Sequence, residues 1–124
     1  MAVDAKRILI ADDMPNGREL IRTILEKCGY EVVEASDGQQ ALDSVAARRP
    51  DLVILDLQMP VLNGYEVLER LRSDAANRDL PIVALTANAM HGDREKALQA
   101  GFTAYIPKPV SLSHLRSQIS SLLG

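Results

Sequence analysis

Short apolar runs alternate along the chain with longer amphipathic segments, and this alternation limits the folds open to it. Nearly continuous apolar runs cover residues 8–11, 52–55 and 82–85, and weaker runs of the same kind cover 31–35 and 103–106. A strand without polar alternation is covered on both faces, as in a parallel sheet. The sequence therefore predicts five strands, most of them buried on both faces.

Helix signals fill the gaps between these runs. Asn63 is followed three residues later by Glu66, and Ser36 by Gln39, which is the spacing of a capping box at a helix start. Glycine follows the first and fourth amphipathic segments, as is common at helix ends. Strict alternation of strands and helices predicts an α/β fold, a doubly wound, flavodoxin-like parallel sheet with strand order 2-1-3-4-5.

The length and composition fit one globular domain. The chain has 124 residues, of which 47% are hydrophobic, and we expect a domain over residues 6–123 after a short tail, residues 1–5. The net charge is −3, and the lysines and arginines are scattered, which argues against a nucleic-acid surface. No apolar run approaches the roughly 20 residues that span a bilayer. We therefore expect a cytoplasmic protein without membrane contact, as a monomer or a weak dimer.

The sequence has one cysteine, Cys28, which excludes an internal disulfide. Ile24 and Leu25 precede it at helical spacing. Because a free cysteine usually behaves as a small apolar residue, we expect this thiol to be buried with them.

Three aspartates follow the strands that should flank the ligand site. In a sheet of order 2-1-3-4-5 the site lies between strands one and three, at their carboxyl ends. Asp12 and Asp13 follow the first of these strands, and Asp56 ends the other. Close carboxylates repel by roughly 4 kcal/mol per pair at an effective dielectric constant of about 20, so their convergence requires a cation. Oxygen ligands without His or Cys favour Mg²⁺. The simpler alternative is three solvated acids at strand ends.

A hydroxyl and an ammonium follow the next two strands. Thr86 ends the fourth strand, beside the third, and Lys108 follows the fifth, from which its long side chain could reach the site. A carboxylate nucleophile, a metal and a cation that offsets phosphate charge form a set suited to phosphoryl transfer. Taken singly, an exposed threonine and a surface lysine would be ordinary.

These residues resemble a known family. From about residue 6 to residue 123, the chain is similar to the receiver domains of two-component response regulators. The matching pieces are 8–13 (ILIADD), 51–60 (DLVILDLQMP), 63–64 (NG), 84–87 (ALTA), 100–101 (AG) and 108–109 (KP). Their common order and spacing carry the resemblance. The stretch 84–90 is especially similar to receivers of hybrid histidine kinases.

The resemblance implies a role for each acid. Asp56 would be the phosphoacceptor. Asp12 and Asp13 would hold Mg²⁺, together with the Asp56 carboxylate and the main-chain carbonyl of Gln58. Because that last ligand belongs to the backbone, the glutamine side chain is not tied to metal binding.

The resemblance also implies residues that respond to the phosphoryl group. Thr86 would hydrogen-bond to it, Lys108 would pair with it, and the Lys108–Pro109 peptide would be cis. Tyr105 stands at the family's switch position. The simpler interpretation of this residue is a strand tyrosine packed half-exposed.

The resemblance implies partners as well. A sensor histidine kinase or a histidine phosphotransfer protein would supply the phosphoryl group. The face formed by the fourth helix, fifth strand and fifth helix would then change for an unknown downstream protein. Ala87, Asn88 and Pro109 would modulate the reaction, as would the side chain of Gln58. We expect a signalling switch rather than an enzyme, catalysing only its own phosphoryl transfer and dephosphorylation.

Three alternatives stay open. A phosphatase with an aspartyl nucleophile would place its two acids two residues apart after the first strand, whereas Asp12 and Asp13 are adjacent. A flavin-binding protein would need a phosphate-binding loop of small residues where these acids stand. The third alternative is an adaptor that keeps the fold without accepting phosphate, and it would not respond to Mg²⁺.

Overall fold

The computed structural model describes residues 5–87 and 92–123. Its elements, in chain order, are β1 (Arg7–Ala11), α1 (Pro15–Lys27), β2 (Glu31–Ala35), α2 (Gly38–Ala47), β3 (Leu52–Asp56), α3 (Gly64–Arg72), the 3₁₀ helix η1 (Ala75–Asn77), β4 (Ile82–Thr86), α4 (Asp93–Ala100), β5 (Ala104–Pro107) and α5 (Leu112–Leu123). The strands form one parallel sheet in the order β2-β1-β3-β4-β5. The predicted fold class and strand order are confirmed.

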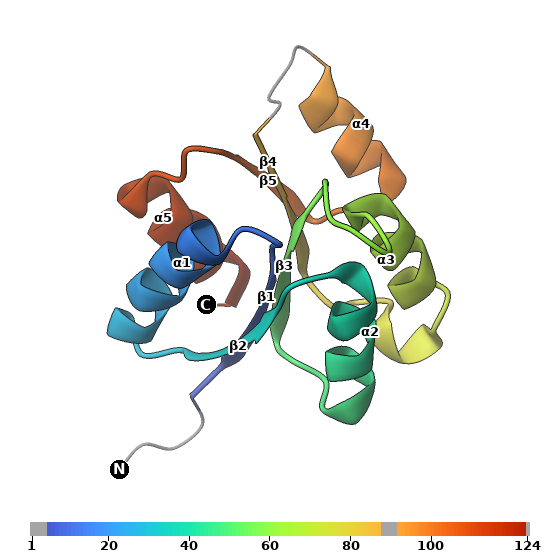
Figure 1. The fold of residues 1–124 in the computed structure, drawn as a ribbon, viewed down its shortest axis with the longest axis horizontal. Coiled ribbons are helices and arrows are strands. Elements are labelled where there is room, and N and C mark those ends of the chain that lie inside the picture. The colour runs from blue at the N-terminus through green and yellow to red at the C-terminus, as the bar shows by residue number, and fades with distance from the viewer. Residues whose placement is uncertain (1–4, 88–91, 124) are drawn as a thin grey trace.

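Helices cover both faces of this sheet. Figure 1 shows α1 and α5 on one face and α2, α3 and α4 on the other. Ile8, Ile10 and Ile54 pack toward α1 and α5, whereas Leu9 and Val53 pack toward the other three helices. Burying each such side chain contributes about 1.5–3 kcal/mol. The uninterrupted apolar strands of the sequence are therefore explained by two cores, one on each face.

The helix starts confirm one prediction and correct another. At α3, Asn63 and Glu66 form the expected capping box, in which each side chain accepts a hydrogen bond from the other residue's backbone N–H. At α2 the N-cap is Asp37, whose carboxylate accepts from the N–H of Gln40 at 2.8 Å. The start predicted near Ser36 is thus displaced by one residue, because the backbone places the Asp37 carboxylate, and not the Ser36 hydroxyl, at the first helical turn.

The prediction that Cys28 is buried is wrong, because the thiol is exposed. Leu25 is fully buried, but α1 ends at Lys27 and Cys28 is its C-cap. Helical spacing from Ile24 and Leu25 therefore does not predict burial at this position, one residue past the end of α1. None of the helices within the described ranges combines the length and the apolar character needed to cross a bilayer.

Candidate functional site

Three carboxylates meet at the carboxyl ends of β1 and β3. Ala11 pairs with Leu55, so Asp12 and Asp56 emerge at the same level of the sheet. One carboxylate oxygen each of Asp12, Asp13 and Asp56 lies within 4.8 Å of the other two. Asp12 is 0% exposed and Asp56 5%, whereas Asp13 is exposed. The predicted convergence of the three acids is present, with one of them open to solvent.

Asp12 is held by its neighbours, and its second carboxylate oxygen is paired with Lys108. Its N–H donates to the carbonyl of Ala35 at 3.1 Å, and its Oδ1 accepts from the N–H of Met14 at 2.9 Å. Its Oδ2 is buried, accepts no hydrogen bond from the described residues, and lies 3.0 Å from Lys108 Nζ. This oxygen therefore retains lone pairs that point into the acidic cluster.

Asp56 is buried between a backbone donor and an ammonium. Its Oδ1 accepts from the N–H of Gln58 at 2.9 Å, and its Oδ2 accepts from Lys108 Nζ at 2.8 Å. Burial raises the pKa of Asp56, although both contacts act to lower it. Burial alone would lower the pKa of Lys108, but the carboxylates of Asp56 and Asp12 raise it. We conclude that Lys108 is a charged ammonium among the acids.

The charges of the site do not balance. Asp12, Asp13 and Asp56 face the single ammonium of Lys108, which leaves an excess of negative charge among these four side chains. In a partly buried site this repulsion between carboxylates destabilises the protein more than it would in water. The arrangement therefore attracts a cation with a preference for oxygen ligands.

Several of the remaining predicted residues lie at the ends of β4 and β5. Thr86 ends β4 and is buried, Ala87 is exposed, and the Lys108–Pro109 peptide is cis, as expected. The N–H of Lys108 donates to the Thr86 carbonyl at 2.7 Å, which ties the ends of β4 and β5 together. Asn88 lies outside the described residues.

Tyr105 shares a sheet face with Thr86. Tyr105 pairs with Ala84, two residues before Thr86, so the two side chains are diagonal neighbours. The tyrosine is half-buried, and its hydroxyl is enclosed without a hydrogen-bond partner among the described residues. Burial raises its pKa, with smaller contributions from Asp93 and Tyr65. Tyr105 is therefore an aromatic side chain beside α4 and α5 whose hydroxyl makes no hydrogen bond with the described residues.

Gly64 is a site residue whose purpose the sequence did not reveal. It is the first residue of α3, and a Cβ placed on it would lie 2.6 Å from the Asp56 carbonyl oxygen and 2.9 Å from Leu57 Cα. Its N–H donates to the Leu57 carbonyl at 3.1 Å. Only glycine permits this approach, so Gly64 fixes how closely α3 packs behind Asp56.

The family model for the response regulator receiver domain matches residues 8–120. The chain belongs to this family. Receivers are phospho-accepting domains of two-component signalling that interact with histidine kinases or phosphotransfer proteins.

Individual relatives agree with the family match. The polar-differentiation response regulator DivK of Brucella anthropi is 40% identical over 119 residues, which cover 96% of this chain and 97% of that protein. The receiver domain of the sensor histidine kinase PA1611 of Pseudomonas aeruginosa, solved with a magnesium ion in its active-site cleft, has a TM-score of 0.88 and 37% identity, covering 96% of this chain and 98% of that one. The chemotaxis response regulator CheY4 of Vibrio cholerae has a TM-score of 0.90 and 28% identity, covering 97% of this chain and all of that one. This receiver therefore matches these three proteins over nearly their whole length.

Proposed function

We propose that this receiver accepts a phosphoryl group on Asp56 with the help of Mg²⁺, and that the modification changes the α4–β5–α5 face for a protein partner. The observation that carries the proposal is the position of the Asp56 carboxylate, 2.8 Å from Lys108 Nζ and beside Asp12 and Asp13. The Asp56 carboxylate can thus act as the nucleophile, with the Lys108 ammonium and a possible cation site both beside it.

The residues present fit Mg²⁺. The three carboxylates carry excess negative charge, and the buried Oδ2 of Asp12 accepts no hydrogen bond among the described residues. Within residues 5–87 and 92–123, the cluster of possible metal ligands consists of carboxylates and includes no cysteine or histidine. Asp12, Asp13, Asp56 and the backbone carbonyl of Gln58 would hold the ion. Bound there, it would neutralise the acids and part of the charge on the incoming phosphoryl group.

The transfer needs little covalent chemistry from the protein. A carboxylate oxygen of Asp56 forms a bond to the phosphorus of a phosphohistidine, the P–N bond breaks, and the imidazole nitrogen keeps the electron pair. Lys108 offsets the negative charge on the group in transit. The donor would be a sensor histidine kinase or a histidine phosphotransfer protein, and Asp13 lies on the exposed side from which it approaches.

The switch uses Thr86 and Tyr105. A phosphoryl group on Asp56 adds negative charge and acceptor oxygens. The Thr86 hydroxyl then bonds to one of them, and Tyr105, its diagonal neighbour, moves into the space that this opens. A bias of a few kcal/mol suffices to change the populations of two conformations of α4, β5 and α5.

Two alternatives are disfavoured by specific positions. A phosphatase would need an acid two residues after Asp12, where Met14 stands. An adaptor that does not accept phosphate would have no reason to hold three acids and a lysine in one cluster.

We propose that the chain is a switch rather than an enzyme with turnover. Its cytoplasmic location and its monomeric or weakly dimeric state stay predictions.

Intact mass after incubation with acetyl phosphate tests the proposal. The native chain should gain one phosphoryl group when Mg²⁺ is present and none when Mg²⁺ is chelated. Asp56→Asn should gain none, whereas Asp43→Asn, which changes an exposed acid on α2, should behave like the native chain. Equal labelling of Asp56→Asn and the native chain would refute the assignment.

A further inference from the structure

Arg18 connects strand β2 to the loop that carries the site acids. It lies in the first turns of α1, and its Nη1 donates to the main-chain carbonyl of Asp12 at 2.7 Å. Its Nε donates to Oε1 of Glu34, in β2, also at 2.7 Å. One planar guanidinium thus bridges a carboxylate of the sheet edge and a carbonyl of the β1–α1 loop. A lysine ammonium could not reproduce this two-armed geometry.

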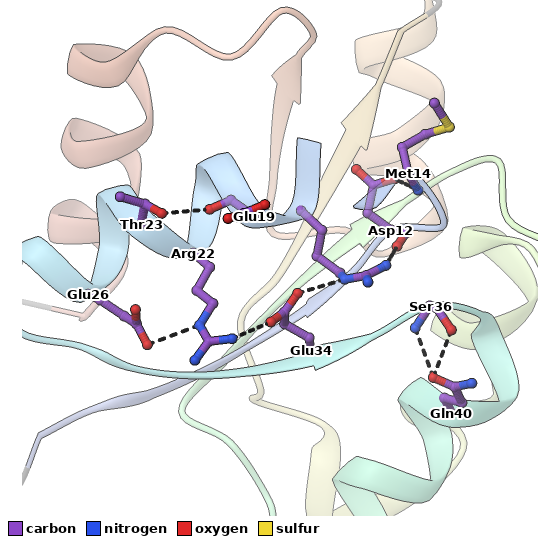
Figure 2. A network of polar contacts seen from close by, with 10 residues as sticks. Asp12, Met14, Glu19, Arg22, Thr23, Glu26, Glu34, Ser36 and Gln40 are labelled. Carbon is purple, nitrogen blue, oxygen red and sulfur yellow. Dashed lines mark hydrogen bonds and ion pairs between the residues drawn. The ribbon is translucent and has the colours of Figure 1, made fainter. Parts of the chain in front are cut away.

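Glu34 fixes the direction of Arg18. The second oxygen of Glu34 accepts from Arg22 Nη1 at 2.6 Å, and Arg22 also binds Glu26. Figure 2 shows the Glu34 carboxylate between Arg22 and the loop that contains Asp12. Hydrogen bonding from Arg18 holds the pKa of Glu34 below its ordinary value. The Arg18 side chain is 17% exposed and that of Arg22 is 45% exposed. Arg18, which reaches the loop of the site acids, is therefore the more buried of the two arginines.

The carbonyl that Arg18 binds belongs to the peptide that joins Asp12 to Asp13. The atoms of a peptide group lie in one plane, so fixing the Asp12 oxygen also fixes the plane from which Asp13 begins. Across residues 5–87 and 92–123, no hydrogen bond or ion pair holds the Asp13 carboxylate itself. The direction of this exposed acid therefore depends on its backbone, which Arg18 holds at the Asp12 carbonyl and the Asp12 carboxylate holds at the Met14 N–H.

We infer that Arg18 is a positioning residue of the cation site, aligning the Asp12–Asp13 peptide so that the Asp13 carboxylate faces Asp56. The inference rests on the proposed function, because it assigns part of the Mg²⁺ affinity to a residue that does not touch the ion. Removing a positive charge near a cation site should by Coulomb's law strengthen Mg²⁺ binding, whereas losing a positioning residue should weaken it.

Matched variants separate these two effects. Arg18→Gln and Arg22→Gln each remove one positive charge that binds a Glu34 oxygen, but only Arg18 contacts the Asp12 carbonyl. We expect Mg²⁺ affinity, measured by titration of backbone amide chemical shifts, to fall about tenfold or more in Arg18→Gln. Arg22→Gln should bind Mg²⁺ as the native chain does, or slightly more tightly. Arg18→Lys keeps the charge, so a weakened affinity there reports geometry alone.

A second readout needs no bound ion. The N–H of Met14, which donates to Asp12 Oδ1, should exchange with solvent faster in Arg18→Gln than in Arg22→Gln when both are metal-free and urea unfolding shows both to be folded. Native-like affinity and native-like Met14 exchange in both Arg18 variants would overturn the inference. Failure of the native chain to bind Mg²⁺ would instead overturn the proposed function, while the Met14 exchange rates would still decide whether Arg18 holds the loop.

Discussion

The ammonium nitrogen of Lys108 lies 2.8 Å from Oδ2 of Asp56, and yet the pKa of this carboxyl is raised above its ordinary value. Burial is the main cause, and repulsion from Asp12 adds to it. One ammonium is therefore insufficient for this cluster of acids. A proton on Asp56 or a bound metal ion would each relieve the repulsion among these acids.

The raised pKa of Asp56 predicts the sign of a pH dependence. Because the folded chain binds the Asp56 proton more readily than the unfolded chain, this residue stabilises the fold at low pH, and that contribution is lost as pH rises through the folded pKa. As pH is lowered from 7 toward the ordinary pKa of aspartate, about 4, the free energy of unfolding of the metal-free native chain should therefore rise relative to that of Asp56→Asn. Urea unfolding of the native chain and of Asp56→Asn at each pH measures this difference in the free energy of unfolding. A gain by the asparagine variant would contradict the pKa direction.

Asp13→Asn should stabilise the metal-free protein. The substitution removes one of three mutually repelling carboxylates, whose oxygens lie within 4.8 Å of one another. Since Asp13 is exposed, the gain should be about 1 kcal/mol or less. The same variant should lose the rise in melting temperature that Mg²⁺ gives the native chain. Asp43→Asn, remote on α2, serves as the control; an equal gain there would show that the effect is not specific to the site.

Gly64→Ala should destabilise the fold by about 1–3 kcal/mol, because its Cβ would lie 2.6 Å from the Asp56 carbonyl oxygen. Gly17→Ala is the matched control. A Cβ on Gly17, within α1, meets its nearest neighbour at 3.6 Å, and the added helix propensity should make this change neutral or stabilising by up to about 1 kcal/mol. Urea unfolding compares them. Equal stability of the two variants would show that α3 can move away from Asp56 without cost.

Val61→Gly should leave the fold equally stable or raise the free energy of unfolding by up to about 1 kcal/mol. Val61 has a φ of 71°, which is unfavourable for a β-branched side chain. It is 71% exposed, so little packing is lost on its removal. The turn itself is closed by the Leu62 N–H, which donates to the Pro60 carbonyl at 2.8 Å. A loss of more than about 1 kcal/mol on thermal or urea unfolding would show that the valine side chain makes a contribution that its exposure does not indicate.

Most of the fold could be predicted because its signals are local. Unbroken apolar runs mark strands covered on both faces, and the rules of right-handed crossover leave few ways to connect them. The meeting of Asp12 and Asp56 followed from the strand order, since their strands are neighbours although the residues are far apart in sequence. The cap of α2 was misplaced because Ser36 and Asp37 are both good caps, and only the backbone decides between them.

The remaining features depend on distances that no pattern encodes. The bridge from Glu34 through Arg18 to Asp12 joins two elements and a loop, and neither Glu34 nor Arg18 belongs to a motif that points to the site. Val61 gives no sign in the sequence that its φ is positive. Gly64 was part of a recognised piece of sequence, but its closeness to Asp56 appears only in three dimensions.

Locating the phosphoryl group on the chain tests the central claim most directly. The protein would be labelled with acetyl phosphate and Mg²⁺ and then reduced with borohydride, which converts an aspartyl phosphate to homoserine. Peptide mass mapping then identifies the reduced residue. Our account predicts that reduction occurs at Asp56 and at no other residue, and only in samples that contained Mg²⁺. Reduction at Asp12, Asp13 or another acid, with Asp56 unchanged, would contradict it.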